Sequence, residues 1–143
     1  MSGVSVHVAT PGDVALVHGL MRGLAVYEKL EHALVSTEAD LAEALFGALP
    51  ACEAIVAEID GTPVGFALYY RTYSTFLGKP GLYLEDLFVV PTFRGRGYGK
   101  ALLAHLAKLA VEEFSPFVDC VSTCAKRGRD CDVVRSARIR WSP

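Results

Sequence analysis

A glycine-rich loop between a strand pattern and a helix pattern is the part of the sequence best suited to chemistry. It reads Arg94-Gly95-Arg96-Gly97-Tyr98-Gly99-Lys100. A helix start leaves backbone N–H groups without partners and carries partial positive charge, and glycines let such a backbone approach a ligand closely. Arg94, Arg96 and Lys100 add positive charge around the loop. The loop therefore predicts a site for a diphosphate group.

Other phosphate-binding loops fit this spacing less well. The glycines fall at positions 95, 97 and 99, so the G-x-G-x-x-G spacing of dinucleotide-binding loops is missing. The P-loop ending in Gly-Lys-Ser/Thr is missing as well, because Ala101 follows Lys100. An Arg-Gly repeat can contact RNA, but here a single copy stands between a strand and a helix pattern. An ordinary tight turn is the remaining structural interpretation.

Patterns on both sides of this loop predict a sheet flanked by helices. Strand patterns cover residues 4–8, 54–59, 64–73 and 82–90, and helix patterns cover residues 10–27, 36–46 and 97–114. The segments that begin at Thr10 and Ser36 carry the capping signatures of helix starts. Asp60-Gly61 predicts a hairpin turn, and residues 74–81 are expected to form a loop. This order predicts an α/β fold with a mixed, mostly antiparallel sheet.

Length and composition favour one domain with a full core. The chain has 143 residues, of which 52% are hydrophobic. No apolar run approaches the roughly 18 residues of a membrane span, and the N-terminus lacks the basic and apolar segments of a secretory signal. We therefore expect a cytoplasmic protein. The net charge of −2 argues against a general nucleic-acid binder.

The end of the chain differs from the rest in charge. The net charge is −5 over residues 1–114 and +3 over residues 115–143. No helix or strand period runs through the later segment, apart from a short strand pattern at residues 118–121. We therefore divide the chain into a core, residues 1–114, and a basic, cysteine-rich tail, residues 115–143.

Three of the four cysteines, Cys120, Cys124 and Cys131, lie in the tail. A disulfide framework suits small secreted chains, so free thiols are expected here. Zinc is disfavoured, because the spacing C-x3-C-x6-C lacks a paired C-x2-C knuckle and a clear fourth ligand.

The loop Arg94-Gly95-Arg96-Gly97-Tyr98-Gly99 resembles the R/Q-x-x-G-x-G/A signature of the GNAT superfamily of acyl-CoA-dependent N-acetyltransferases. In that family, as here, the signature follows a strand and opens a helix. Further segments are similar to the diamine acetyltransferase branch, which includes spermidine/spermine and thialysine acetyltransferases. They are Tyr27-Glu28, Phe66-Ala67-Leu68-Tyr69-Tyr70, Thr72-Tyr73-Ser74-Thr75 and Tyr83-Leu84-Glu85-Asp86. The resemblance covers residues 5 to about 113.

This resemblance implies a GNAT fold, acetyl-CoA as co-substrate and a small amine as acceptor. The strand backbone at Leu87, Phe88 and Val89 is implied to face the pantetheine arm and the acetyl carbonyl. The pyrophosphate is implied to lie against the loop, at Arg94, Gly95, Arg96, Gly97, Tyr98, Gly99 and Lys100. The amine is implied to meet Tyr27, Glu28 and Glu85.

Carboxylates suit an amine acceptor. An alkyl ammonium has a pKa of about 10.4, so an enzyme must attract the cation and help to remove a proton before the amine attacks. Glu85 can do both, directly or through water, and strand N–H groups can stabilise the resulting oxyanion. Strand alternation points Asp86 to the other face of the sheet, and we favour Glu85 over Asp86 mostly because of the resemblance. Glu28 also has the simpler interpretation of a solvated helix end.

The tail departs from the family pattern. Relatives continue after the long helix with a strand, an Asn-containing loop and a helix bearing Tyr-x-x-x-Gly, whose tyrosine is the usual candidate for protonating the CoA thiolate. Here no tyrosine follows Tyr98, and Asn is absent from the chain. Without the family's closing strands, we expect an open sheet edge beside residues 82–90. Relatives commonly form homodimers, which an altered tail can disturb.

The sequence therefore predicts an N-acetyltransferase that moves acetyl from acetyl-CoA to a polyamine or lysine-like amine by direct attack. The alternative, from another class, is a catalytically impaired acyl-CoA-binding protein with an altered C-terminus. RNA binding through the Arg-Gly loop and the basic tail is a third interpretation, and it predicts salt-sensitive retention on RNA. No metal, membrane or nucleic-acid partner is expected.

Overall fold

The computed structural model describes residues 3–113 and 132–139, with the backbone alone for Glu113 and residues 134–139. Over these residues the strands form one sheet in the order β1-β2-β3-β4-β5, and every neighbouring pair is antiparallel. The strands are β1 (Ser5–Val8), β2 (Glu53–Ile59), β3 (Thr62–Ser74), β4 (Lys79–Val89) and β5 (Val133–Ile139). The α/β class and the largely antiparallel sheet predicted from the sequence are confirmed.

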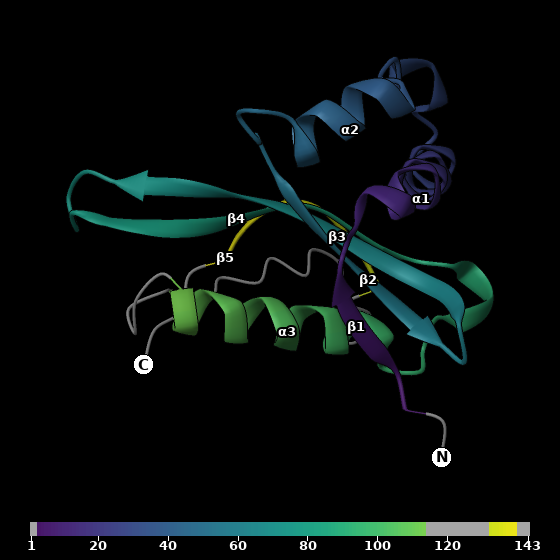
Figure 1. Ribbon diagram of the computed structural model, residues 1–143. Helices are drawn as coiled ribbons and strands as arrows, with labels where there is room; N and C mark the ends of the chain where they lie inside the picture. Colours follow the sequence, from purple (N-terminus) through teal and green to yellow (C-terminus); the bar gives the residue numbers. More distant parts are fainter. Residues whose placement is uncertain (1–2, 114–131, 140–143) are drawn as a thin grey trace.

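Helices cover both faces of this sheet. Helices α1 (Val14–Tyr27) and α2 (Glu38–Phe46) lie on one face, and α3 (Tyr98–Glu113) lies on the other (Figure 1). Each side has its own buried apolar cluster. The α3 side includes Leu84, Leu87 and Leu102, whereas the α1 side includes Leu24 and Phe88. The sheet therefore holds a two-sided core, in which neighbouring residues of β4 serve opposite faces.

Both early helices begin where their capping signatures predict. The Thr37 backbone N–H donates to Asp40 Oδ2 at 2.8 Å, and the Asp40 N–H donates to Thr37 Oγ1 at 3.1 Å. The Thr10 N–H likewise donates to Asp13 Oδ2 at 2.8 Å, ahead of a short 3-10 turn over Pro11–Asp13 that leads into α1. Such reciprocal bonds satisfy N–H groups that a helix start leaves without partners.

The two hairpins differ in how well the sequence predicts them. Asp60 and Gly61 join β2 to β3 with φ angles of +49° and +78°, the left-handed pair that a tight hairpin turn requires. The next connection is shorter than expected, because β3 runs to Ser74 and β4 already begins at Lys79. Residues 74–81, predicted as a loop, instead form the ends of two paired strands around a short turn. In Figure 1 this hairpin extends beyond the helices.

Strand β5 covers the outer edge of β4. Its register runs from Leu82 opposite Ile139 to Phe88 opposite Val133. The prediction of an open edge beside residues 82–90 is therefore wrong for the residues that the structure describes. The short strand pattern at 118–121 lies outside them. Sequence reasoning missed β5 because its pairing partner is about fifty residues away, and its own residues carry no clear alternation.

Candidate active site

A β-bulge sets the orientation of the two central carboxylates. Leu68 of β3 lies opposite Asp86 and the following Tyr69 lies opposite Leu84, so Glu85 is an extra residue on β4. Leu84 and Leu87 both pack on the α3 side of the sheet. Glu85 and Asp86, between them, both face the opposite side, where they line one pocket. The prediction that Asp86 points to the other face from Glu85 is therefore wrong, because the bulge interrupts strict alternation.

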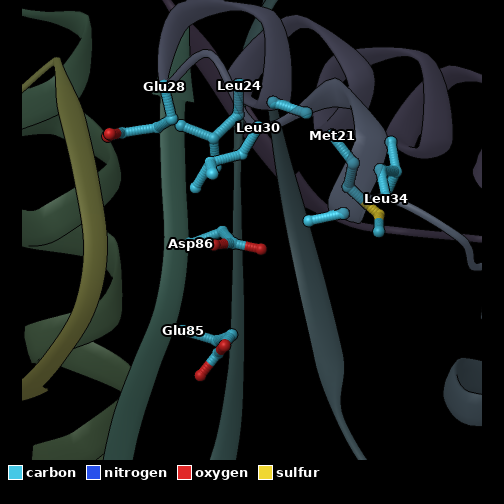
Figure 2. Close-up of a pocket in the computed structure, with 9 residues that line it drawn as sticks. Met21, Leu24, Glu28, Leu30, Leu34, Glu85 and Asp86 are labelled. Carbon is cyan, nitrogen blue, oxygen red and sulfur yellow. The ribbon is translucent and has the colours of Figure 1, made fainter.

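The pocket between α1 and β4 combines an apolar wall with acidic groups. Its volume is about 150 Å³, enough for a group the size of benzene. Its apolar lining comes from Met21, Leu24, Ala25, Leu30, Ala33 and Leu34, and its acidic lining from Glu28, Glu85 and Asp86. Figure 2 shows Asp86 next to the apolar side chains of Leu24 and Leu30, with Glu85 farther along β4. Such a pocket suits a short alkyl chain that ends in a cation.

The turn that ends α1 builds one wall of this pocket. The Leu30 N–H donates to the Ala25 carbonyl at 2.8 Å, and the Lys29 N–H donates to the Val26 carbonyl at 3.1 Å. These two bonds form a Schellman cap, in which Lys29 occupies the left-handed position with a φ of +56°. The cap directs Leu30 into the pocket and leaves Glu28 at its exposed rim.

Tyr27 and Arg94 connect this pocket to the glycine-rich loop. The Arg94 guanidinium carbon lies 4.7 Å from the centre of the Tyr27 ring and 5.0 Å from that of Phe88. Its Nε donates to the Val89 carbonyl at 2.8 Å. Its Nη2 is buried and has no hydrogen-bond partner among the described residues. Arg94 thus stacks between the last residue of α1 and the end of β4, with one donor still to be satisfied.

The glycine-rich loop presents backbone donors, as the sequence predicted for an anion site. Gly95 and Gly97 adopt φ angles of +76° and +87°, which side chains rarely tolerate. Because α3 begins at Tyr98, the Gly99 N–H lies in its first turn. The Gly95 N–H donates to Asp132 Oδ2 at 2.9 Å, and the Gly99 N–H donates to Asp132 Oδ1 at 3.2 Å. A carboxylate of this chain therefore lies where a phosphate is expected.

The two other basic residues of the loop stay at its surface. Arg96 and Lys100 are exposed, and the Arg96 guanidinium carbon lies 5.7 Å from the centre of the Phe93 ring. Their charges can therefore reach a ligand on the outside of the loop, whereas the Arg94 guanidinium faces the Tyr27 side.

The β4 segment implied to face acetyl-CoA is paired on its outer side. The side chains of Leu87, Phe88 and Val89 are buried in the two cores. Phe88 lies opposite Val133 of β5, and the Val89 N–H donates to the Asp132 carbonyl at 2.8 Å. The backbone edge expected to meet the pantetheine arm is thus in contact with residues from the tail.

The donors at this end of the molecule fit the phosphates of a CoA group. Two backbone N–H groups already bind a carboxylate, which stands in for a phosphate oxygen pair, and Arg94 Nη2 has no partner among the described residues. Anions prefer this position because the start of α3 carries partial positive charge. The residues present are therefore compatible with a diphosphate, provided that Asp132 leaves.

Sequence reasoning missed two parts of this site. Asp132 is one of three acids in a basic segment, and nothing local marks it as a partner of residues more than thirty positions earlier. The bulge at Glu85 was missed because the alternation around it still resembles a regular strand.

His18 lies outside the site. It is buried, and its Nε2 lies 2.9 Å from the Ser36 carbonyl, so it links α1 to the start of α2. The cysteine pattern of the tail lies outside the described residues.

Comparison with known proteins agrees with the fold. Residues 23–123 match the acetyltransferase (GNAT) family. The chain belongs to this family. It is 36% identical to the thialysine N-epsilon-acetyltransferase of Bos taurus, in an alignment that covers 79% of this chain and 71% of that protein. It is 30% identical to an L-ornithine N5-acetyltransferase of Arabidopsis thaliana, over 75% of this chain and 67% of that protein.

A solved structure supports the same conclusion. The ribosomal-protein-alanine N-acetyltransferase from Brucella melitensis biovar Abortus 2308 superposes with a TM-score of 0.63 and 26% identity, over 77% of this chain and 73% of that one. The GNAT chain is therefore an acetyl-CoA-dependent N-acetyltransferase, as the sequence predicted. No helix in residues 3–113 is long and apolar enough to cross a membrane.

Proposed function

We propose that this GNAT chain transfers acetyl from acetyl-CoA to the terminal primary amine of a small cationic substrate, either a polyamine or a lysine-like amino acid. The observation that carries the proposal is the pocket that Glu28, Glu85 and Asp86 line together with apolar side chains. Negative groups at the pocket attract an alkyl ammonium, and the apolar wall accepts its methylene chain. The relatives named for thialysine and L-ornithine act on amines of this class.

In the proposed reaction Glu85 attracts the ammonium and accepts its proton, directly or through water. The free amine nitrogen then attacks the acetyl carbon and forms a tetrahedral intermediate. As this intermediate collapses, the bond from the acetyl carbon to the CoA sulfur breaks, and the second proton of the nitrogen passes to water or to the departing CoA thiolate. Backbone N–H groups at the end of β4 stabilise the charge on the acetyl oxygen. Tyr27 and Glu28 hold the substrate at the rim, where Tyr27 is 53% exposed.

Direct attack agrees with the thiol chemistry of the described residues. Cys52 is the free cysteine among them, and it is half-buried. Burial raises the pKa of its thiol, with a smaller contribution from neighbouring Glu53. A thiol with a raised pKa is a poor nucleophile at neutral pH, so an acetylated cysteine intermediate at Cys52 is disfavoured.

In the same proposal acetyl-CoA is held by the loop and the end of β4. Its pyrophosphate meets the backbone of Gly95, Gly97, Tyr98 and Gly99, with Arg94, Arg96 and Lys100 supplying positive charge. Its pantetheine arm and acetyl carbonyl lie along the backbone of Leu87, Phe88 and Val89. Two supports are the backbone donors at Gly95 and Gly99 and the Arg94 Nη2, which has no hydrogen-bond partner among the residues that the structure describes.

The test is acetyl-CoA-dependent thiol release with thialysine, lysine, ornithine, spermidine and short diamines. We expect Glu85→Gln to lower kcat by roughly a hundredfold or more, the usual range for losing a general base. Glu53→Gln, at an exposed acid at the start of β2, is the matched control and should keep wild-type rates. Wild-type kcat in Glu85→Gln would exclude the role of this carboxylate.

A second candidate function follows from the contact of Asp132 with the loop. In that case the chain binds acyl-CoA weakly and catalyses little or no transfer, because Asp132 of its tail occupies two loop N–H groups expected to bind the cofactor. Detectable acetyl-CoA binding without thiol release on any amine supports this alternative. Release above the background without amine supports the enzyme.

Three finer expectations are part of the proposal. We propose a cytoplasmic location, a homodimer, and a division between an acetyl-CoA-binding core, residues 1–114, and a basic tail, residues 115–143. Sedimentation of the purified chain measures the oligomeric state, and fractionation of cells that express it measures the location. A monomer at micromolar concentration would contradict the homodimer without affecting the assignment of the amine site.

A further inference from the structure

Asp132 is the most deeply buried acidic residue that the structure describes. It is 5% exposed, and its carboxylate accepts from the Gly95 N–H at 2.9 Å and from the Gly99 N–H at 3.2 Å. Burying a carboxylate is unfavourable unless strong donors replace its water. Here the replacement comes from two loop amides at the positive end of α3. The same donors are those expected to bind a pyrophosphate.

The contact extends from the side chain of Asp132 to its backbone and beyond. The Asp132 carbonyl accepts from the Val89 N–H at 2.8 Å, and β5 then pairs with β4 from Phe88 to Leu82. One continuous segment, residues 132–139, therefore contacts the pyrophosphate loop and the strand edge implied to meet pantetheine. A chance surface contact is not expected to cover both the loop for the pyrophosphate and the strand edge for the pantetheine arm of acetyl-CoA.

We propose that residues 132–139 are an autoinhibitory segment that covers the loop and the β4 edge expected to bind acetyl-CoA, so that acetyl-CoA and this segment compete for the same backbone groups. The proposal rests on the cofactor placement given above. Competition follows because an N–H group that donates fully to Asp132 is not free for a phosphate oxygen. In addition, the negative charges of the Asp132 carboxylate and of the pyrophosphate would repel each other at this position. Acetyl-CoA therefore binds only to molecules in which the segment has left β4.

The first experiment measures acetyl-CoA and CoA affinity of the full chain by calorimetry. Asp132→Ala removes the carboxylate, and Val134→Pro removes a backbone N–H from β5 and disturbs its pairing with β4. We expect each variant to bind acetyl-CoA at least roughly tenfold more tightly than wild type. The reason is that each substitution removes hydrogen bonds that compete with acetyl-CoA for the loop or for β4. Asp40→Asn removes a capping carboxylate on α2, which accepts from the Thr37 N–H and is not part of the loop or of β4. This variant should bind acetyl-CoA with the wild-type affinity.

The second measurement keeps the test decisive if Val134→Pro is misfolded by circular dichroism. Hydrogen exchange on the wild-type chain should accelerate in residues 132–139 when saturating CoA is added, because β5 is displaced. Unchanged or slower exchange there, or weaker acetyl-CoA binding in a folded Asp132→Ala, would overturn the proposal.

The outcomes separate this inference from the proposed function. Variants that bind acetyl-CoA more tightly but acetylate no amine support the autoinhibitory segment and reject the amine acetyltransferase. Wild-type activity with β5 still protected at saturating CoA supports the enzyme and rejects the segment's role.

Discussion

Glu85 and Asp86 are adjacent in the sequence, and a bulge turns both toward one pocket. Two carboxylates in such a place can divide the work on an ammonium, one accepting its proton and the other holding its charge. Glu85 is the extra residue of the bulge, and bulges commonly re-aim a side chain at functional sites. We therefore propose that Glu85 removes the proton and that Asp86 recognises the charge, although strict alternation predicted that Asp86 faces the other side of the sheet.

Asp86→Asn tests this division at the scale of single residues. Removing one partly exposed charge weakens attraction to the amine by about 1 kcal/mol, so KM should rise roughly fivefold. The kcat should stay within about twofold of wild type, because the asparagine keeps the shape and the proton acceptor is untouched. Steady-state kinetics with thialysine and spermidine provide the readout. A loss of kcat as large as that of Glu85→Gln, at unchanged KM, would contradict the division.

At the scale of elements, the end of α1 carries a local strain next to the pocket. Lys29 holds a left-handed φ of +56° in the Schellman cap, a position that glycine adopts more easily. The cap positions Leu30 and Glu28 at the acidic pocket between α1 and β4. The strained residue thus belongs to the turn that shapes the site, a place where strain is often retained.

Lys29→Gly should stabilise the fold by about 0.5–1 kcal/mol, because relief of the strained φ outweighs the added freedom of the unfolded chain. Urea unfolding of both proteins measures the change, with equal slopes expected for the two transitions. The same substitution at exposed Lys108, inside α3, is the matched control and should destabilise by about 1 kcal/mol. A less stable Lys29→Gly protein would show that the lysine side chain contributes more than its φ costs.

Elements set by local chemistry were predictable, and those set by distant contacts were not. The caps at Thr10 and Thr37 depend on residues three positions apart, so the sequence identifies both helix starts. The Asp60-Gly61 turn is equally local. By contrast, β5 depends on pairing with β4, and Asp132 acquires its partners only when α3 and the tail come together. The sequence predicted that the loop binds an anion, but it did not predict that the Asp132 carboxylate of the same chain lies there.

At the scale of the whole molecule, two capped helices cover the sheet face that holds the acidic pocket. In Figure 1, α1 and α2 pack side by side on that face. Each is preceded by a reciprocal cap in which a threonine backbone N–H donates to an aspartate. These backbone bonds hold the pKa of Asp13 and of Asp40 below the ordinary value of 3.8. His7, whose Nε2 lies 3.3 Å from Asp13 Oδ2, lowers the pKa of Asp13 further.

Both caps should make the fold acid-sensitive. A carboxyl with a folded-state pKa below its unfolded value contributes stability that is present above the unfolded pKa and is lost as pH falls through the folded pKa. The urea midpoint should therefore fall as pH is lowered from about 5 to below 3.8. The double variant Asp13→Asn and Asp40→Asn should be less stable than wild type at pH 7 and should approach it at low pH. The difference in urea midpoint should narrow because the ionised carboxylates accept the capping bonds most strongly. A difference that stays constant as pH falls would mean that these aspartates act by packing rather than by charge.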